Sequence, residues 1–294
     1  MPHGWLILDK PRGLGSTQAV GAVKRVLRAG GHGKVKVGHG GTLDPLAEGV
    51  LPIALGEATK LAGRMLDASK TYAFTVAFGI QTTTLDTEGE VVAASEHRPS
   101  VAEVKAVLPR FTGPIDQVPP AFSALKVDGR RAYALARAGQ EVELATRSVT
   151  IHALTLLDTG ADHATLLAHV SKGTYIRSLA RDIALALGTV GHVTFLQRRQ
   201  AGPFTQDQAI SLDMLEEIGK GAPLEDHLLR LEAGLDGIPA LTLDPEDVQA
   251  VRQGRVLSGQ PHADGLHLAT TGDVPVALVE IAGGTMKVVR GFNL

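Results

Sequence analysis

Residues 38–60 read GHGGTLDPLAEGVLPIALGEATK, and Asp44 follows three glycines within a few residues in this segment. Two interpretations fit that position. The Asp44-Pro45 pair is typical of a turn between two elements, but an oriented and sheltered aspartate is also a nucleophile in some enzymes. Glycines before an aspartate can cradle phosphate, yet the GK[ST] ending of a P-loop and the GxGxxG pattern are both missing.

A nucleophilic aspartate requires a nearby cation that favours its ionised form, and the chain offers one much later in the sequence. In the stretch 171–182, SKGTYIRSLARD, Arg177 and Arg181 flank the apolar stripe of a predicted helix. The arginine fork binds both oxygens of a carboxylate. Tyr175 precedes Arg177, and Tyr72 lies on a predicted strand. A solvated helix edge and a core tyrosine remain the plainer interpretations, so the residues alone indicate only a carboxylate–arginine–aromatic pocket.

Composition excludes several classes of chemistry. The 294 residues contain no cysteine, which rules out disulfides, thiol catalysis and cysteine-bound metal clusters. The eleven histidines show no metal-ligand spacing. No long apolar run and no signal-peptide pattern are present, so we expect a cytoplasmic protein without membrane segments, metal or cofactor.

Charge is distributed unevenly, although the formal net charge is only −2. Residues 1–64 carry nine Lys and Arg against four Asp and Glu, whereas residues 206–294 carry six against fourteen. Binding to a polyanion depends on the local field rather than on the net charge. The pattern therefore suits a partner that touches one basic face, and scattered surface charge for solubility is the alternative.

Hydrophobic periodicity predicts an α+β fold with a mixed, mainly antiparallel sheet, because strands and helices occur without strict βαβ alternation. A linker is expected at 234–239, followed by a small β-rich region. The predicted strands cover 5–8, 50–55, 70–78, 149–157, 163–170 and 192–199, and the predicted helices begin at or near residues 16, 57, 100, 176, 211 and 224.

Six segments together carry a resemblance to a known family. They are LDKPRGLGST (8–17), the opening stretch (38–60), the K-x-Y of Lys70 and Tyr72, PPAFSALKVDGRRAY (119–133), SKGTYIRSLARD (171–182) and GHVTFLQRRQAGPF (191–204). In order and spacing they closely resemble the motifs of the TruB family, the bacterial tRNA pseudouridine-55 synthases. So many coincidences in one order argue strongly against a role for Asp44 as a turn only.

The resemblance implies a pseudouridine-synthase catalytic domain over 1–233, with an RNA-gripping insertion around 113–147, and a small PUA-like domain over 240–294. It implies isomerisation of the T-loop uridine of tRNA after base flipping, which needs no cofactor. The implied partner is the T-arm of tRNA, bound by a monomer without an obligate protein partner.

The resemblance also implies roles for individual residues. Asp44 matches the nucleophile, and whether it attacks C6 of the base or C1′ of the sugar stays open. Arg177 matches its ion-pair partner, Tyr72 the ring that stacks on the base, and His39 a residue that helps to displace the flipped nucleotide. Tyr175 and Leu196 match residues that line the pocket. The expected RNA contacts are Lys10, Lys126, Arg130, Arg131 and Arg137, with an ordinary charged loop as the alternative for the insertion.

Three positions depart from the family pattern: Phe122 replaces a tyrosine, Thr83 replaces an aspartate, and Gln197 replaces a residue that is often basic. None of them is the expected nucleophile or its arginine. Two other functions remain open, namely a non-catalytic tRNA-binding module on the same fold and a guide-RNA-dependent enzyme with protein partners. The presence of Asp44, Tyr72 and Arg177 argues against the first, and the short chain without a basic tail argues against the second.

Overall fold

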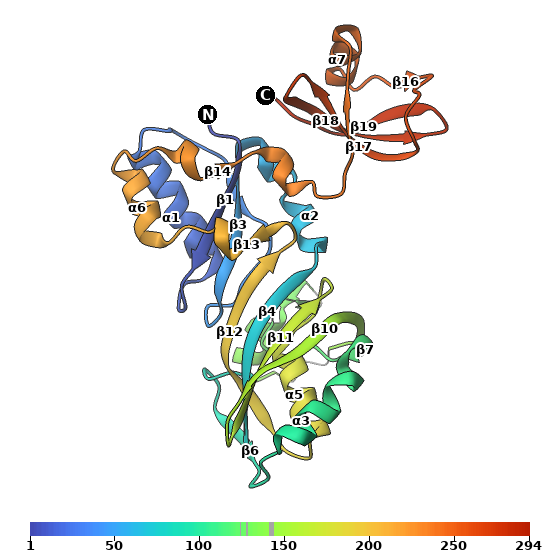
Figure 1. Ribbon diagram of the computed structural model, residues 1–294. Helices are drawn as coiled ribbons and strands as arrows, with labels where there is room; N and C mark the ends of the chain where they lie inside the picture. The colour runs from blue at the N-terminus through green and yellow to red at the C-terminus, as the bar shows by residue number, and fades with distance from the viewer. Residues whose placement is uncertain (124, 128, 141–143) are drawn as a thin grey trace.

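A computed structural model describes residues 1–123, 125–127, 129–140 and 144–294. It contains one ten-stranded sheet, a five-stranded sheet near the C-terminus and two short hairpins (Figure 1). The strands of the large sheet are β1 (Gly4–Lys10), β2 (Val37–His39), β3 (Glu48–Leu55), β4 (Lys70–Phe78), β7 (Gly113–Gln117), β10 (Arg147–Thr159), β11 (His163–Val170), β12 (Gly191–Ala201), β13 (Phe204–Thr205) and β14 (Leu228–Leu229).

The main path of the large sheet runs β14-β1-β3-β12-β4-β11-β10-β7, with β2 paired to β3 and β13 paired to β12. Among the strand pairs described for this sheet, β3 and β12 form the one parallel pair, in which Gln197 lies opposite Glu48 and Arg198 opposite Gly49. The predicted α+β class with a mixed, mainly antiparallel sheet is confirmed. The parallel junction brings two segments that are far apart in the sequence together at the centre of the sheet.

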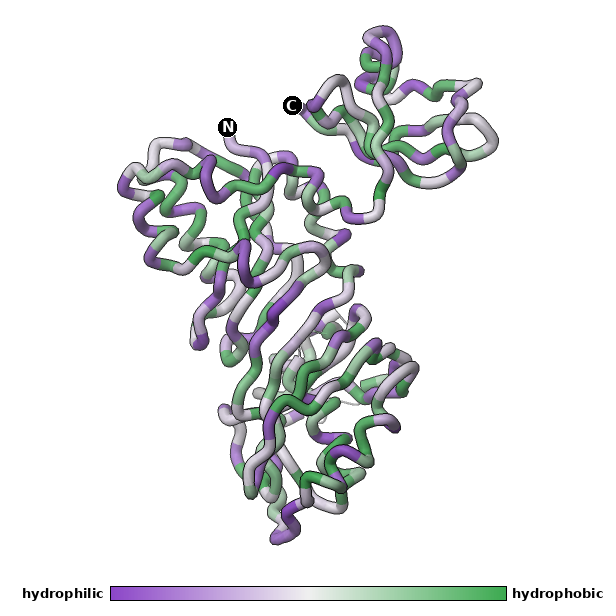
Figure 2. Tube along the Cα trace, viewed as in Figure 1, coloured by the Kyte–Doolittle hydropathy of each residue, from purple (hydrophilic) through white to green (hydrophobic). Residues whose placement is uncertain are grey.

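Helices cover the two halves of this sheet with separate cores. Helix α1 (Ser16–Ala29) and α6 (Leu212–Gly219) pack on β1 and β3, whereas α3 (Val101–Val107) and α5 (Ile176–Ala186) cover β4, β11 and β12. Figure 2 shows hydrophobic and hydrophilic residues alternating along the helices, as amphipathic packing requires. Short helical segments complete this region: η1 (Gly56–Lys60), α2 (Ala62–Asp67), η2 (Leu108–Phe111), η3 (Gln206–Gln208), η4 (Leu224–His227) and η5 (Leu231–Gly234). No helix in the described residues has both the length and the apolar character to cross a bilayer.

The second sheet lies in the C-terminal region in the order β15-β17-β18-β19-β16. It has its own core and is joined to the rest of the protein by Phe292, which packs in the same cluster as Trp5. Glu57 accepts a hydrogen bond from the Asn293 amide at 2.8 Å, which adds a polar contact between the two regions. The elements are β15 (Ala240–Thr242), α7 (Pro245–Arg252), β16 (Leu257–Ser258), β17 (Gly265–Thr271), β18 (Val274–Ala282) and β19 (Thr285–Gly291).

Two hairpins project from the large sheet. One consists of β5 (Ile80–Thr82) and β6 (Val91–Ala94), and its turn faces the loop that carries Asp44. The other lies in the segment expected to grip RNA and consists of β8 (Lys126–Val127) and β9 (Arg130–Arg131), followed by α4 (Ala132–Arg137). The side chains of Lys126, Arg131 and Arg137 lie outside the described part of the structure.

Candidate active site

The loop between β2 and β3 holds Asp44 through its backbone. Ser16, the first residue of α1, is buried, and its Oγ both accepts from the Leu43 amide and donates to the Leu43 carbonyl, each at 2.8 Å. The Ala47 amide donates to the Asp44 carbonyl at 3.1 Å, which closes a short turn after the aspartate. The aspartate therefore sits in a turn, as its proline neighbour suggested, but in a turn that is fixed from outside the loop.

Arg198, on the neighbouring strand β12, fixes the same loop. This β12 side chain is 1% exposed, and it donates to three backbone carbonyls: Val50 at 2.7 Å, Gly41 at 3.2 Å and Thr42 at 3.2 Å. Among the described residues it forms no ion pair with a carboxylate. Burying an unpaired guanidinium is costly unless its hydrogen-bonding groups are satisfied, so the carbonyls of Gly41 and Thr42 are strongly held. The sequence reasoning missed this role of Arg198.

Lys10 corrects one expectation. It was expected to contact RNA, but its side chain is fully buried, and its ammonium donates to the carbonyls of Leu14 at 2.7 Å, Pro11 at 3.0 Å and Pro45 at 3.4 Å. Burial lowers the pKa of Lys10 to about 8, partly offset by the charge of Asp44. Lys10 therefore supports the end of the Asp44 loop from inside, and the prediction of an RNA contact is wrong.

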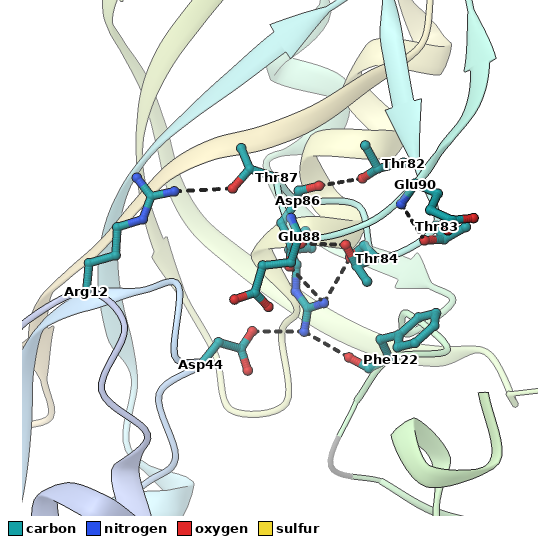
Figure 3. Close-up of polar contacts among 11 residues, drawn as sticks. Arg12, Asp44, Thr82, Thr83, Thr84, Asp86, Thr87, Glu88, Glu90 and Phe122 are labelled. Atoms are coloured by element: carbon teal, nitrogen blue, oxygen red, sulfur yellow. Dashed lines mark hydrogen bonds and ion pairs between the residues drawn. The ribbon is translucent and has the colours of Figure 1, made fainter. Parts of the chain in front are cut away.

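Arg177 meets Asp44 from the first turn of α5. Its Nη2 lies 2.8 Å from Asp44 Oδ2 and donates to the Phe122 carbonyl at 3.0 Å, while Nη1 donates to the Thr84 carbonyl at 2.9 Å (Figure 3). The Arg177 side chain is 7% exposed, whereas that of Asp44 is 42% exposed. The arginine is therefore a fixed, buried donor, and the carboxylate that it orients remains open to a reactant. The contact with Phe122 uses the backbone, so the missing tyrosine hydroxyl does not affect it.

A second carboxylate, Asp86, holds the other side of Arg177. Its Oδ2 lies 3.3 Å from Arg177 Nη1, and its side chain is only 4% exposed. The Glu88 amide donates to Asp86 Oδ1 at 3.0 Å, and Thr84 Oγ1 donates to the same oxygen. The preceding residue, Leu85, has a φ of 63°, a left-handed conformation that costs a non-glycine residue energy. This strained turn aims Asp86 at the arginine, a role that the sequence reasoning did not assign.

A cavity of about 110 Å³ opens between the aspartate and the aromatic residues. Tyr72 from β4, Tyr175 at the start of α5 and Leu196 from β12 line it together with Asp44 and Arg177. The structure thus gathers these five expected residues around one space. An apolar slot with one carboxylate and one guanidinium suits a flat heterocycle that must react at a defined edge.

Different residues hold the backbone and the ring of Tyr175. Gln117 accepts from the Tyr175 amide at 2.8 Å and donates to its carbonyl at 3.1 Å. The guanidinium carbon of Arg147 lies 5.6 Å from the ring centroid, in range for a cation–π interaction. Burial raises the pKa of Tyr175, and the charge of Asp44 acts in the same direction. The phenol is therefore protonated at neutral pH and can serve as a hydrogen-bond donor.

His39 lies apart from the cavity, in a wider groove of about 500 Å³ that shares Asp44 and Arg177 with it. The Gly41 amide donates to His39 Nδ1 at 3.3 Å, so the neutral ring carries its hydrogen on Nε2. Burial, with a contribution from the charge of Arg198, lowers the pKa of His39. A neutral histidine at the groove wall fits contact with RNA outside the reacting pocket. In the described residues, no group of three or more histidines and carboxylates has a metal-binding arrangement.

Of the four residues in the insertion that are expected to contact RNA, the structure describes the side chain of one, Arg130. Arg130 begins β9 and is exposed. The structure does not describe the side chains of Lys126, Arg131 and Arg137. Their contact with RNA therefore stays a prediction.

Comparison with known proteins agrees with this geometry. The sequence profile described as "TruB family pseudouridylate synthase (N terminal domain)" matches residues 24–176, more than half of the chain. The chain belongs to the TruB family. A second profile, "tRNA pseudouridylate synthase B C-terminal domain", matches residues 177–236. The two matches meet inside α5, between Ile176 and Arg177, and together they include the whole pocket of this TruB-family protein.

Full-length relatives support the same assignment. The "tRNA pseudouridine synthase B" of Novosphingobium aromaticivorans is 68% identical over 299 aligned positions, covering 100% of this chain and 98% of the relative. That of Zymomonas mobilis is 57% identical, covering 99% and 96%. Among solved structures, one described as "Crystal Structure of a Cbf5-Nop10-Gar1 Complex" is similar at 27% identity and a TM-score of 0.75, covering 99% of this chain and 85% of that chain. The likeness of this TruB-family chain extends over the small C-terminal sheet as well.

Proposed function

We propose that this TruB-family chain converts the T-loop uridine at position 55 of tRNA to pseudouridine, with Asp44 as the nucleophile. The observation that carries the proposal is the ion pair of 2.8 Å between Asp44 and a buried Arg177, at the side of a small cavity lined by Tyr72, Tyr175 and Leu196. Relatives named tRNA pseudouridine synthase B cover nearly the whole chain at up to 68% identity. TruB-family enzymes are isomerases.

The reaction balances within the substrate. The bond between N1 of the base and C1′ of the sugar breaks, the base rotates, a bond from C5 to C1′ forms, and the proton of C5 is lost while N1 gains one. Arg177 orients the carboxylate of Asp44 for attack on either C6 or C1′. Tyr72 stacks on the base and is the candidate group for the proton transfer. Because the product has the same atoms and oxidation state as the substrate, the chemistry requires no cofactor.

The cavity dictates how the substrate arrives. A uridine stacked inside a tRNA loop cannot place its base in a cavity of about 110 Å³, so the nucleotide must flip out. We assign His39 and the wide groove to the displaced loop, and the insertion around 113–147 to the grip on the T-arm. RNA loops with unstacked bases suit this form of recognition.

Three broader assignments belong to the same proposal. We propose that the catalytic domain spans 1–233 and that 240–294 forms a PUA-like domain. We also propose that the protein acts in the cytoplasm as a monomer and needs no protein partner, since the pocket is built from this chain alone.

Replacement of Asp44 by asparagine tests the function. Asp44→Asn keeps the size and the turn-forming ability of the residue but removes the anionic oxygen. We expect the variant to fold, to bind an unmodified T-arm hairpin within a few-fold of the parent protein, and to form no pseudouridine. Asp162→Asn, in the exposed β10–β11 turn, is the matched control and should retain full activity. Substantial turnover by Asp44→Asn would return Asp44 to a turn-forming role, and binding without turnover by the parent protein would favour a tRNA-binding module.

A further inference from the structure

The exposed face of α1 is basic in the second half of the helix. Exposed positions recur every three or four residues along the helix, so they lie on one side of it. They are Thr17, Gln18, Gly21, Lys24, Arg25, Arg28 and Ala29. The loop after the helix adds two further exposed lysines, Lys34 and Lys36. We call the five cations of this surface, Lys24, Arg25, Arg28, Lys34 and Lys36, the α1 basic face.

No ion pair in the described residues neutralises the charge of the α1 basic face. Between Lys10 and Leu43 the sequence contains no aspartate or glutamate. In the part of the chain that the structure describes, none of the five cations forms an ion pair or a side-chain hydrogen bond. The neighbouring helix α6 carries three exposed acidic residues, Asp213, Glu216 and Glu217. Among the described ion pairs none of them joins the α1 basic face, and Glu217 pairs instead with Lys220, just beyond the end of the same helix, at 2.8 Å. The positive surface therefore remains available to an external anion.

The exposed side of α1 begins at the candidate active site, and its cations start about two turns further along, at Lys24. Thr17 and Gln18, in the first turn of α1, line the wide groove that also contains Asp44 and His39. Fourteen residues of α-helix extend for about 20 Å. The α1 basic face therefore lies on the helix whose first turn forms part of the groove wall, beyond the groove itself.

Gly21 lies in the middle of this face and has no structural explanation. A Cβ added there would meet no heavy atom within 4 Å, so no internal packing excludes a side chain. A glycine inside a helix costs about 1 kcal/mol relative to alanine. Because Gly21 has no side chain, an extended ligand can approach the helix backbone closely beside the cations.

We propose that the α1 basic face binds the sugar-phosphate backbone of tRNA outside the target loop. The proposal rests on the function given above, and it names a contact surface separate from the insertion around 113–147. A cluster of exposed cations without ion pairs, on a helix that starts at the substrate groove and the loop that follows it, matches the negative charge of an RNA backbone. Arg28 alone has a second explanation, because a cation in the last turn stabilises the helix dipole. That explanation does not extend to Lys24, Arg25 or the two loop lysines.

The test compares two double variants that each remove two exposed positive charges. Arg25→Gln with Arg28→Gln alters the α1 basic face, and Lys105→Gln with Arg110→Gln alters exposed positions on and after α3, on the other half of the large sheet. Affinity for an unmodified full-length tRNA transcript is measured over a range of salt concentrations. We expect the first pair to flatten the slope of log affinity against log salt by about one unit per arginine. We expect the second pair to keep the slope of the parent protein.

A third variant tests whether weaker tRNA binding could result from a loss of protein stability. Gly21→Gln introduces a better helix former, so its melting temperature should not fall, yet its bulk should weaken tRNA binding. Unchanged slopes for the α1 pair, or equal slope changes for the two pairs, would overturn the proposal. Failure of the proposed function is a separate result, since it would appear as a parent protein that forms no pseudouridine, whatever the salt slopes of its variants.

Discussion

The buried side chain of Arg198 donates a hydrogen bond to the carbonyl of Thr42 at 3.2 Å, and Thr42 lies two residues before Asp44. It also holds the carbonyls of Gly41 and Val50, so one buried side chain connects β12, β3 and the loop between β2 and β3. Its charge is satisfied by backbone oxygens rather than by a carboxylate. We therefore regard Arg198 as a positioning residue for Asp44.

Arg198→Lys should slow the chemical step without weakening tRNA binding, because the three carbonyls are bonded by three different nitrogens of the guanidinium, which the shorter lysine with its one nitrogen does not replace. We expect the single-turnover rate to fall by about tenfold or more, equivalent to about 1.4 kcal/mol. Arg199→Lys, at the exposed neighbouring position, is the control. A melting curve identifies variants that simply fail to fold. A folded Arg198→Lys protein with the parent rate would show that the loop keeps its shape without the arginine.

Asp86→Asn should reduce both stability and activity. The substitution keeps an acceptor for the Glu88 amide but removes the charge beside the buried Arg177 guanidinium. A hydrogen bond to a charged group contributes about 2 kcal/mol, and the loss should appear in denaturant unfolding. Asp182→Asn removes a more exposed partner of Arg181 on the same helix and should cost less. Equal losses for the two variants would contradict a special role for Asp86.

Lys10→Met should change how stability depends on pH. The pKa of Lys10 is about 8 in the folded protein and 10.5 ordinarily, so folding disfavours its charged form. This penalty is fully present below pH 8 and disappears as the pH rises from about 8 to 10.5. The parent protein should therefore gain stability relative to Lys10→Met over that interval, by on the order of 1–3 kcal/mol. Unfolding measured from about pH 7 to pH 10 tests this, with exposed Lys105→Met as the control.

Removal of Arg130, Arg131 and Arg137 should weaken tRNA binding. The triple alanine variant loses charges from the segment proposed to grip the T-arm, so the slope of log affinity against log salt should decrease by about one unit per lost phosphate contact. Single-turnover rates at saturating tRNA should change much less than affinity. An unchanged slope would place the grip elsewhere, and the α1 basic face would then be the first surface to examine.

The general arrangement of the site was accessible from the sequence. The strand and helix patterns indicated the fold class, because α5 has a clear apolar stripe and β4 alternates large and small residues. The motifs then predicted which residues belong together. Asp44 and Arg177 lie in segments that are far apart in the sequence, so periodicity alone could not pair them, and the family resemblance was needed.

The errors and omissions concern residues whose role depends on burial. A lysine before a proline reads as a surface turn, and no local pattern reveals that the Lys10 ammonium lies under the Asp44 loop. Arg198 occupies an inward position of β12, between the buried Leu196 and Ala201. An arginine at an inward position of a predicted strand was the available signal for its role. The role of Asp86 was harder to predict from the sequence, because the direction of its side chain depends on the left-handed backbone conformation of Leu85.

The parallel pairing of β3 with β12 has a consequence for synthesis on the ribosome. Asp44, Tyr72 and Asp86 are all made in the first third of the chain, but Arg177 comes much later, and Arg198 must wait until β12 has emerged to pair beside β3. Contacts of such long sequence separation form slowly. A nascent chain that ends before β12 therefore has the nucleophile but no assembled centre. It cannot act on the tRNAs that crowd the ribosome until most of its own translation is complete.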